Sequence, residues 1–573
     1  MDATLFPGPE GQLLTICTRC SLSQTPVPSS CRITTQAFRS VRWSSANTST
    51  QLRSENKPCW KDRIAQLRDV YPDPYPRLSV DKRSISCDEF HTRYNSLAPN
   101  ETAEQDKVVI CGRIQSARSA GSKLIFLDLV QNGRKVQILC NQRHMDAMGV
   151  TPEKFKQFYH LLRRGDVLSV IGNPHRTGRG ELSVTVSELP KLITPCLHDI
   201  PLRVKEQETS PYDRHVQLLS SPTASDILRT RSAIIQYIRN FFFNRSFMEV
   251  ETPILASVAG GAVARPFQTC ATEFPDRPLA LRIAPELWLK RLVVGGFDKV
   301  FEIGPSFRNE GLDNTHNPEF TTCEFYHAYA DLETLISITE SLLTGLSQHI
   351  HTLHQTIQSS LSLPPAPFTT PFRRLDFIPA LEQAMSHKLP NLTPTSTHNP
   401  TTQIHELFNN HLNQPLPSNP TLPRLLNRLS SIYLEPQCKE PTLIINHPEC
   451  LSPLSKSFIH PQCGQVVAAR AELFIDSREV MNMYEEENSP FEQRRKFEGQ
   501  VGVQGKEMGC GVGSGEGGGK VGDESYLRAL QWGLPPTGGW GCGVDRLCML
   551  FTGARRIGDV LSFGNLRSVT RSE

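Results

Sequence analysis

Charged and aromatic side chains recur at a spacing of two in one part of this chain. Arg308 and Glu310 stand two apart, and Glu324 and Tyr326 repeat that spacing after a turn-rich segment that contains His316. On a β-strand, residues two apart point to the same face. We expect two strands joined by a polar loop, with a cation, acids, a histidine and aromatic rings on one surface. Considered alone, such a hairpin is more often a solvated charged face than a site.

A second stretch carries carboxylates that suit a divalent cation. Between residues 472 and 486 the pattern favours a pair of strands, on which Glu472 and Glu479 could converge. Mg²⁺ is typically held by one or two carboxylates together with phosphate oxygens. The same stretch contains Asn482, Tyr484 and Glu486.

The third stretch is a glycine-rich strand, residues 533–546, that runs into a helix over 547–552. Glycine at alternate positions leaves one face of that strand bare, so a flat ligand could lie against it. Arg546 at the start of the helix can reach a phosphate group. A phosphate loop of the strand–GxxxxGK[ST]–helix kind is absent from the sequence.

Amphipathic and apolar segments would position these residues. Apolar side chains at three-to-four spacing predict a helix over 225–243, followed by a strand over 247–255 that ends at a proline. Another strand over 281–286 ends at Glu286, which would begin the helix 287–294 and could simply favour its dipole. A small-residue loop around Gly261 allows a ligand to approach the backbone closely. A further helix is expected over 331–350.

Residues 58–205 are expected to form an OB-fold barrel. Alternating apolar residues predict five strands, the Asn-Gly pair at 132–133 predicts a hairpin turn, and a helix near 152–162 separates the third and fourth strands. Phe126 and Gln137 could lie on adjacent strands with Arg113 nearby. An aromatic ring for stacking and an amide for base edges suit single-stranded RNA, although Phe126 could also be a core residue.

Composition bounds the remaining possibilities. The chain has 573 residues, enough for two or more domains, and lacks an apolar run of about 18 residues. Its net charge of +3 lies in residues 1–57, which hold six basic and three acidic side chains, so the rest is neutral. Segment 11–54 is free of acids and rich in Ser, Thr and Arg, which indicates a mitochondrial transit peptide, the alternative being a disordered tail. Scattered cysteines indicate neither a disulfide scaffold nor a zinc site.

Two segments are expected to lie outside the chemistry. Residues 351–460, rich in Pro, Thr, Asn and Ser, are interpreted as a peripheral insertion with helices near 374–387, 402–413 and 421–432. Residues 498–522 are glycine-rich and are interpreted as a surface loop.

These motifs together resemble a known family. Phe307-Arg308-x-Glu310, the glycine-rich strand ending in Asp545-Arg546, and the helix and strand ending at Pro253 are similar to motifs two, three and one of class II aminoacyl-tRNA synthetases. Finer strings, such as the Arg-Ile-Ala-Pro-Glu-Leu that contains Glu286, resemble the lysyl-tRNA synthetases, and the N-terminal segment resembles mitochondrial enzymes of fungal type. The resemblance covers roughly 105–345 and 465–567.

The resemblance implies an α+β chain with a transit peptide (1–57), an OB-fold anticodon-binding domain (58–205) and a class II catalytic domain built on an antiparallel sheet flanked by helices (206–573). It implies a homodimer through motif one, Mg²⁺ as cofactor, and ATP, L-lysine and tRNA(Lys) as partners. The expected location is the mitochondrial matrix, and no association with a membrane is expected. It further implies these positions: Arg308, Arg546 and His316 as catalytic residues; Arg308, Glu310, His316, Asn317, Phe320, Glu472, Glu479 and Arg546 for ATP; Gly261, Glu286, Arg308, Glu324, Tyr326, Asn482, Tyr484 and Glu486 for lysine; Arg113, Phe126 and Gln137 for the anticodon; Glu472 and Glu479 for the metal.

Other interpretations stay open at this point. Related enzymes that charge aspartate or asparagine would not need Glu486, and a non-enzymatic RNA-binding or polymerase-accessory protein would not need Arg308, Glu479 or Arg546. A paralogue that lysylates proteins should lack the barrel. The chain departs from the family pattern at Met481, Met483 and Glu485, and the sequence does not reveal in which direction the charged side chain of Glu485 points. It also departs at Trp540 and Cys542, which should face away from the ligand.

Overall fold

No helix in the described part of the chain is both long and apolar enough to cross a membrane. The expected transit segment, Gly261 and most of the glycine-rich loop lie outside the described residues. The computed structural model describes residues 60–71, 73–77, 81–121, 123–201, 213–257, 264–357, 359, 361–364, 368–393, 399–412, 414–417, 419–507 and 524–564, without the side chains of 357 and 500–507.

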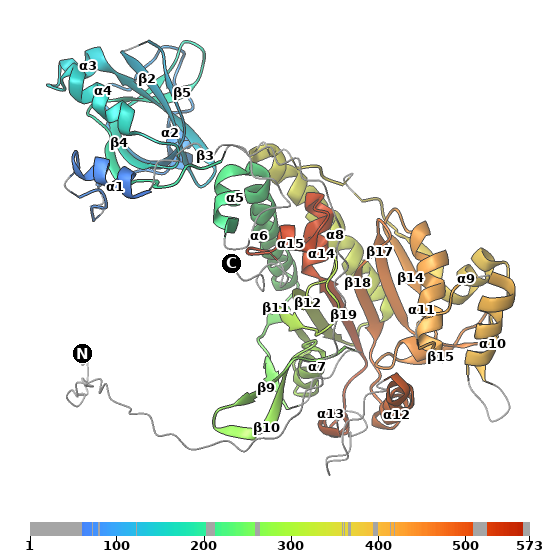
Figure 1. Ribbon diagram of the computed structural model, residues 1–573. Coiled ribbons are helices and arrows are strands. Elements are labelled where there is room, and N and C mark those ends of the chain that lie inside the picture. The colour runs from blue at the N-terminus through green and yellow to red at the C-terminus, as the bar shows by residue number, and fades with distance from the viewer. Residues whose placement is uncertain are drawn as a thin grey trace, which may run out of the picture. The chain divides into compact units, whose positions relative to one another are not determined.

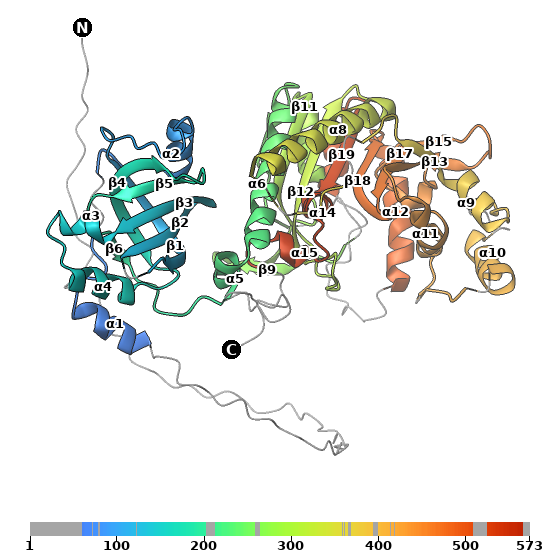
Figure 2. The same cartoon turned by 90° about the horizontal axis from the view of Figure 1, so that it is seen from above.

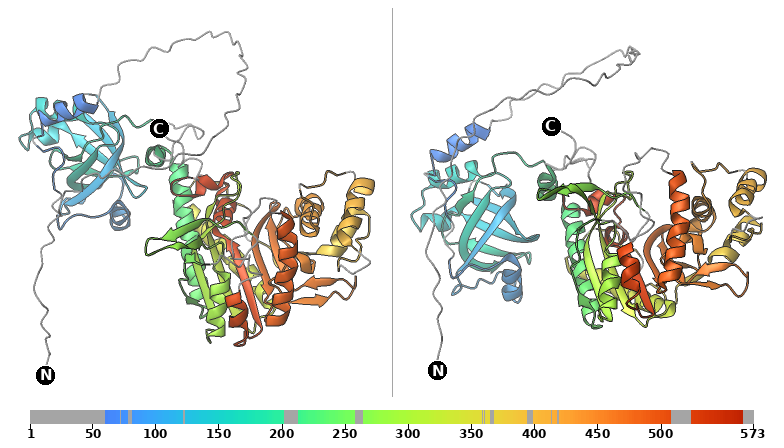
Figure 3. Two further views of the ribbon diagram at one scale, coloured as in Figure 1. Left: turned by 60° about the horizontal axis from the view of Figure 1, so that its bottom comes forward. Right: turned by 90° about the horizontal axis from the view of Figure 1, so that it is seen from below.

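The first domain is the predicted OB-fold barrel. Its strands pair in the order β1-β2-β3-β5-β4, and β4 also pairs with β1, which closes the barrel (Figure 3). Asn132 and Gly133 both have positive φ, as the β2–β3 hairpin turn requires. The elements of this domain are α1 (Trp60–Arg68), α2 (Cys87–Tyr94), β1 (Val108–Ser119), β2 (Leu124–Gln131), β3 (Arg134–Asn141), α3 (Gln142–Asp146), α4 (Pro152–Leu161), β4 (Val167–Arg176), β5 (Leu182–Val186) and β6 (Lys191–Thr194).

The second domain is built on an eight-stranded sheet. Its order is β13-β14-β17-β18-β19-β12-β11-β7, antiparallel except at the two edge pairs (Figure 1). The predicted hairpin is its centre: β11 pairs with β12 along its whole length, and β19 follows on the other side of β12. The strands are β7 (Met248–Glu249), β11 (Lys299–Phe307), β12 (Glu319–Ala328), β13 (Arg373–Asp376), β14 (Thr442–Ile445), β17 (Arg470–Ile475), β18 (Arg478–Glu485) and β19 (Thr537–Gly543).

One face of this sheet is the main hydrophobic core. Helices α6 (Pro222–Phe243), α8 (Leu332–Ile357) and α14 (Val544–Thr552) supply apolar side chains to it, and α6 and α8 lie along the sheet in Figure 2. Phe242, Phe325 and Trp540 meet there with ring centroids 5.1–5.8 Å apart. Because side chains alternate along a strand, the neighbours of these core residues must point to the opposite face.

The opposite face carries both a smaller core and the candidate site. Helices α7 (Glu286–Val294) and α13 (Glu524–Leu530) pack on it through a cluster that includes Leu289, Tyr326 and Leu527. Glu324 and Tyr326 alternate with the core residues Cys323 and Phe325, so the expected shared face of this pair is confirmed.

The remaining elements complete the second domain. Strands β8, β9 and β10 form a separate three-stranded sheet, and β15 and β16 form a hairpin. These elements are α5 (Arg214–Ser220), β8 (Leu255–Ala256), β9 (Gln268–Ala271), β10 (Phe274–Leu281), α9 (Phe377–Met385), α10 (Pro400–Glu406), the π-helix η2 (Leu407–Leu412), α11 (Leu422–Tyr433), the 3-10 helices η3 (Glu435–Gln437) and η4 (Glu449–Leu451), β15 (Ser457–Ile459), β16 (Val466–Ala468), α12 (Pro490–Glu507) and α15 (Ile557–Val560).

Several details differ from expectation. The strand expected over 281–286 is absent, because β10 ends at Leu281, and residues 498–507 of the expected surface loop belong to α12. Strand β11 ends at Phe307, so Arg308 and Glu310 lie in the following loop and their spacing of two does not place them on one strand face. The single strand expected over 247–255 is two short strands, β7 and β8, separated by a segment that contains a proline, which cannot donate to a ladder. The expected insertion is not wholly peripheral, since β13 and β14 join the edge of the main sheet.

Candidate active site

Arg308 is close enough to two groups of ionisable side chains for its charge to act on both. Its guanidinium lies 5.1 Å from the ring centroid of Phe320, and its Nε donates to the Ile283 carbonyl at 3.4 Å. Its positive charge lowers the pKa values of both Glu324 and Glu479, against the larger effect of burial on each. The loop position after β11 therefore still brings Arg308 to the sheet face that carries the other candidates.

The first group is a tyrosine–carboxylate cluster, which consists of Glu286, Lys290, Glu324, Tyr326, Tyr484, Glu486 and Tyr526. The Tyr484 hydroxyl donates to Glu286 Oε1 at 2.6 Å, and the Tyr326 hydroxyl to Glu324 Oε2 at 3.4 Å. Burial, and then the charge of Glu286, raise the pKa of Glu324 to about 8. Three carboxyl groups at one place create a strong local preference for cations.

Lys290 is a member of this cluster that sequence reasoning missed. Its side chain is 0% exposed, and its Nζ lies 2.6 Å from Glu286 Oε1 and 2.5 Å from Glu486 Oε2. The Glu286–Lys290 spacing of four on an amphipathic helix is usual for surface ion pairs, so the sequence held no signal that this pair is buried.

The second group is an arginine–carboxylate cluster around Arg546, in the first turn of α14. Arg546 Nη1 donates to the Glu479 carbonyl at 3.0 Å and lies 3.4 Å from Glu479 Oε2. Arg546 Nη2 donates to His316 Nε2 at 2.9 Å, while His316 Nδ1 lies 2.7 Å from Asp313 Oδ2. These contacts assign a neutral His316 with its proton on Nδ1. The structure thus joins three predicted residues from distant parts of the sequence.

Glu472 belongs to the same cluster and is held on both oxygens. Its Oε1 accepts from Arg470 Nη2, and its Oε2 lies 3.1 Å from His447 Nε2. Burial would raise the pKa of Glu472, but Arg470 and His447 outweigh it and lower the pKa to about 2. Arg470 Nε also donates to Asn482 Oδ1 at 2.8 Å. Glu472 is therefore a fixed anion.

The predicted pair Glu472 and Glu479 fits a divalent cation. Partial burial, and then the charge of Glu472, raise the pKa of Glu479. Burial and both of these carboxylates raise the pKa of Glu435 to about 7, and sequence reasoning missed this residue because it lies in the expected insertion. The described residues contain no group of three or more His, Cys, Asp or Glu side chains arranged for a metal ion. Glu472 and Glu479 stay the candidates for a site of the kind in which one or two carboxylates bind a cation together with ligand oxygens.

Three residues predicted at the nucleotide end are less tightly placed. Glu310 is exposed, and within the described residues no hydrogen bond ties its carboxylate to either cluster. The Asn317 side chain donates to the Glu319 carbonyl at 2.6 Å. Phe320 is half-buried on β12, with Arg308 over its ring. These positions lie in or beside the loop 308–318, next to Arg308 and His316.

The glycines of β19 differ in what surrounds them. A Cβ on Gly539 would lie 1.8 Å from Glu486 Oε1 and 2.8 Å from the Tyr326 ring. A Cβ on Gly541 would meet its nearest atom, Glu324 Cγ, at 3.7 Å, and then the Asn482 carbonyl oxygen at 4.0 Å. Gly539 thus makes room for the protein's own carboxylate, whereas the face of Gly541 is bare, as expected for a strand against which a ligand lies.

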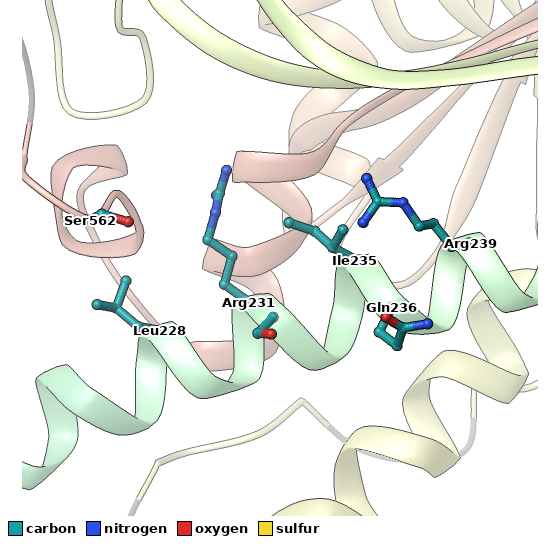
Figure 4. Close-up of a pocket in the computed structure, with 7 residues that line it drawn as sticks. Leu228, Arg231, Ile235, Gln236, Arg239 and Ser562 are labelled. Atoms are coloured by element: carbon teal, nitrogen blue, oxygen red, sulfur yellow. The ribbon is translucent and has the colours of Figure 1, made fainter. Parts of the chain in front are cut away.

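Two buried ion pairs connect the elements that carry the site. Arg231 of α6 lies 2.5 Å from Asp545 Oδ1, and Asp545 Oδ2 accepts from the Thr321 backbone N–H at 2.8 Å. Arg282 donates to Glu302 Oε1 at 2.5 Å. Asp545 therefore has a structural part, tying α6, β12 and α14 together. Figure 4 shows Arg231 rising from α6 into a hollow that holds none of the predicted site residues and is lined by Leu228, Arg231, Ser232, Ile235, Gln236, Arg239 and Ser562.

The departures from the family pattern leave the site intact. Trp540 and Cys542 are buried in the main core, as expected, and Met481 and Met483 lie there with them. Glu485 Oε1 accepts from the Leu332 backbone N–H at 3.0 Å. The side chain of Glu485, whose direction the sequence did not reveal, therefore points toward the start of α8, where the helix dipole favours a carboxylate.

On the barrel, two of the predicted RNA-binding residues, Phe126 and Gln137, lie on the same face of the sheet. Phe126 pairs with Leu139 across β2 and β3, which makes Gln137 its diagonal neighbour on the same face. Gln137 is buried and accepts from Ser183 Oγ at 3.1 Å, while Arg113 Nη1 donates to the Gly165 carbonyl at 2.7 Å. Arg118, which sequence reasoning missed, lies 5.9 Å from the Phe126 ring centroid.

Known proteins resemble both domains. Residues 206–567 match the tRNA synthetases class II (D, K and N), and residues 108–192 match the OB-fold nucleic acid binding domain. The mitochondrial lysine–tRNA ligase of Schizosaccharomyces pombe is 39% identical, over 86% of this chain and 91% of its own. The mitochondrial lysine–tRNA ligase of Saccharomyces cerevisiae is 35% identical, over 81% and 82%. The lysine–tRNA ligase of Deinococcus radiodurans is 34% identical, over 87% and 90%. The chain therefore belongs to the class II tRNA synthetases of the D, K and N group, with an OB-fold domain ahead of its catalytic domain.

Proposed function

We propose that this synthetase activates L-lysine with ATP and transfers it to tRNA(Lys) in the mitochondrial matrix. The observation that supports lysine as the amino-acid substrate is the tyrosine–carboxylate cluster. Glu486 has a fully buried side chain, and its Oε1 has no hydrogen-bond partner among the described residues. A buried carboxylate oxygen without a partner is costly, and a substrate ammonium group would satisfy it.

Activation would proceed without a catalytic base. A carboxylate oxygen of lysine attacks the α-phosphorus of ATP, the bond to the bridging oxygen breaks, and pyrophosphate leaves with that electron pair. Because the nucleophile is already ionised, positioning and charge stabilisation carry the rate. Arg308 would hold the lysine carboxylate and the α-phosphate. Its charge acts on both Glu324 and Glu479, which supports this role, since those residues belong to the proposed amino-acid and nucleotide ends.

The residues around Arg546 would hold the nucleotide. Arg546 would bind the γ-phosphate, His316 the phosphates, Phe320 the adenine ring, and Glu310 and Asn317 the adenine or ribose. The Arg546–His316 contact supports a shared phosphate position. Glu472 and Glu479 would hold Mg²⁺, which supplies charge neutralisation to the phosphates when bound.

Different residues of the tyrosine–carboxylate cluster would bind the two ammonium groups of lysine. Glu286 and Glu324, with Gly261, would take the α-ammonium, while Tyr326 and Glu486 take the ε-ammonium. Asn482 would contact the carboxylate and Tyr484 would form a wall of the pocket. The contacts Tyr484–Glu286 and Tyr326–Glu324 support this arrangement because each tyrosine already orients a carboxylate.

Transfer then requires the tRNA. The terminal adenosine hydroxyl attacks the carbonyl carbon of the adenylate, AMP leaves, and the hydroxyl proton is released. Phe126, Gln137 and Arg113 on the barrel would read a uracil-rich anticodon, with Phe126 stacking on a base.

Dimer formation and location complete the proposal. A homodimer through α6 and β7 is supported by the exposed apolar side chains Phe243 (74%) and Met248 (40%), and sedimentation of the full chain would reveal it. The matrix location is supported by the acid-free segment 11–54 and by the two mitochondrial relatives. Fusion of residues 1–57 to a fluorescent protein tests it.

ATP–pyrophosphate exchange with each of the twenty amino acids tests the function. We expect exchange with lysine alone. Exchange with aspartate or asparagine would contradict the proposal, and no exchange at all would favour an accessory protein. Retention of Arg308, Glu479 and Arg546 argues against the accessory interpretation, because such a protein could lose them freely.

A further inference from the structure

Lys290 places a second ammonium group inside the proposed lysine pocket. It stands one turn after Glu286 on α7, with its side chain 0% exposed and its Nζ between Glu286 Oε1 and Glu486 Oε2. The same Nζ lies 5.7–5.8 Å from three tyrosine ring centroids, those of Tyr326, Tyr484 and Tyr526. Helix α7, the sheet and α13 thus surround this amine, which is a fixed part of the pocket wall.

Stability alone does not account for this arrangement. Buried ion pairs are about as stable as apolar side chains of similar volume, and often less so. Burial lowers the pKa of Lys290, but Glu286 and Glu486 outweigh it and raise the pKa above its ordinary value, so the amine is charged. A permanent charge has been placed among residues that would contact the substrate.

The formal charges of the pocket match lysine only when Lys290 is included. Burial raises the pKa values of Glu324 and Glu486, so both give up a proton when an ammonium group binds beside them. Together with Glu286 they then carry about three negative charges, and Lys290 reduces this to two. Lysine brings two ammonium groups, while its carboxylate would be held by Arg308. The filled pocket is then electrically balanced, which is what a closed, low-dielectric site requires.

Lys290 also occupies only one oxygen of Glu486. Its ion pair lies on Oε2, and Oε1 faces Gly539, without a hydrogen-bond partner among the described residues. On Glu286, both Lys290 and Tyr484 contact Oε1. Each carboxylate is therefore held from one side and can receive an ammonium group on the other.

We propose that Lys290 is a positioning and specificity-determining residue: an internal counter-ion that holds Glu286 and Glu486 and sets the pocket to accept an amino acid with two ammonium groups. The inference rests on the proposed activation of lysine. Removing the charge leaves one carboxylate in excess, so a proton must be bound in its place and competes with the substrate.

The test compares the full-length enzyme with Lys290→Met, which keeps the length of the side chain without its charge. The measurement is lysine-dependent ATP–pyrophosphate exchange from pH 6.5 to 9. We expect the KM for lysine to rise at least tenfold at pH 7, with a smaller change in kcat. Burial raises the pKa of Glu486, and the charge of Lys290 offsets part of this rise. Loss of Lys290 should therefore move the pH at which the KM levels off upward. The other groups that face this site are Glu286, Glu324, Tyr326, Tyr484, Tyr526 and, toward Glu324, Arg308, Arg282 and Glu302.

Lys496→Met is the matched control. Lys496 is also a buried helical lysine, with its Nζ 2.8 Å from Glu487 Oε2, but it lies outside the cluster. We expect this variant to lose stability without a change in the pH profile. A profile for Lys290→Met that matches wild type, at an unchanged KM, would overturn the inference while leaving lysine activation intact.

Chemical rescue covers the case in which Lys290→Met folds poorly. In Lys290→Ala, propylammonium replaces the missing atoms, and we expect it to lower the KM for lysine, whereas 1-propanol of similar size should not. Equal rescue by both would show that Lys290 only fills space and would contradict the proposal. Wild-type enzyme with each additive controls for direct inhibition. Absence of exchange in wild type would instead contradict the proposed function.

Discussion

At the scale of single residues, the free oxygen of Glu486 leads to the sharpest prediction. Glu486→Gln should lower kcat/KM for lysine by about a hundredfold or more, since loss of one partner of a buried charge costs about 3–5 kcal/mol. The fold should persist because Lys290 keeps its contact with Glu286. Glu485→Gln is the matched control, because Glu485 points to the start of α8. Unchanged lysine activation in Glu486→Gln would show that the ε-ammonium site is misplaced.

Glu324 predicts a pH dependence of lysine binding. Its pKa of about 8 means that the carboxyl group is mostly protonated below pH 8, whereas its proposed role, binding the α-ammonium of lysine, requires the carboxylate. The affinity for lysine should therefore rise with pH by up to about tenfold per unit and level off near pH 8. Calorimetric titrations of the free enzyme at several pH values would measure it. In Glu324→Gln the binding should be weaker and this slope should be reduced.

The two neighbouring glycines of β19 should respond differently to an added methyl group. Gly541→Ala places a Cβ in the bare face without a close protein contact, so it should raise the KM for ATP or lysine about tenfold and change stability by less than about 1 kcal/mol. Gly539→Ala should lower the unfolding midpoint because its Cβ would overlap Glu486. Equal effects of both variants on KM and on stability would contradict this distinction.

Sequence spacing predicted the residues whose surroundings are set by local geometry. Glu324 and Tyr326 share a face because strands alternate, and Gly541 is bare for the same reason. Lys290 and Glu435 were missed because their importance comes from contacts with residues far along the chain. Nothing in a local pattern distinguishes a buried lysine four residues after a glutamate from an exposed one.

At the scale of elements, the Arg231–Asp545 ion pair holds motif one against motif three. Arg231→Met should leave a buried carboxylate without its partner and lower the free energy of unfolding of the catalytic domain by about 3–5 kcal/mol. Asp545→Asn should cost a similar amount, and the double variant less than the sum of the two. Denaturant unfolding would measure the cycle, and strict additivity would show that the pair does not couple these elements.

Helices and strands were predicted correctly where the hydrophobic periodicity is strong. They were missed where pairing with distant strands determines the structure. The helix expected over 225–243 and the glycine-rich strand are both present. The short strands β13 and β14 were not foreseen as sheet strands, since their stability comes from neighbours distant in sequence. The same nonlocal pairing brings Glu435, just before β14, under the influence of Glu472 and Glu479.

At the scale of the whole molecule, two domains should contribute separately to the reaction. Phe126→Ala should raise the KM for tRNA roughly fivefold to a hundredfold, as expected for loss of one stacking contact of about 1–3 kcal/mol. ATP–pyrophosphate exchange with lysine should stay at the wild-type level, because it does not use the barrel. Aminoacylation and exchange assays on the same preparation would decide, and an equal loss in both would contradict the separation. The barrel itself was predictable because a helix between the third and fourth of five strands is typical of the OB-fold, and because its turns are marked by glycine.

The alternation of the main sheet also limits how this gene can change. Along β18 and β19, one set of residues is buried under α6 and α8 and the other carries the candidate site. Deletion of a single codon inside either strand would exchange the two sets, burying carboxylates and bringing Trp540 or the methionines against the substrates. These strands can therefore tolerate point substitutions on one face without changing the other face. Insertions and deletions should be confined to connections such as 308–318. Evolutionary drift in this enzyme should accordingly appear as indels in loops and as paired hydrophobic exchanges within strands.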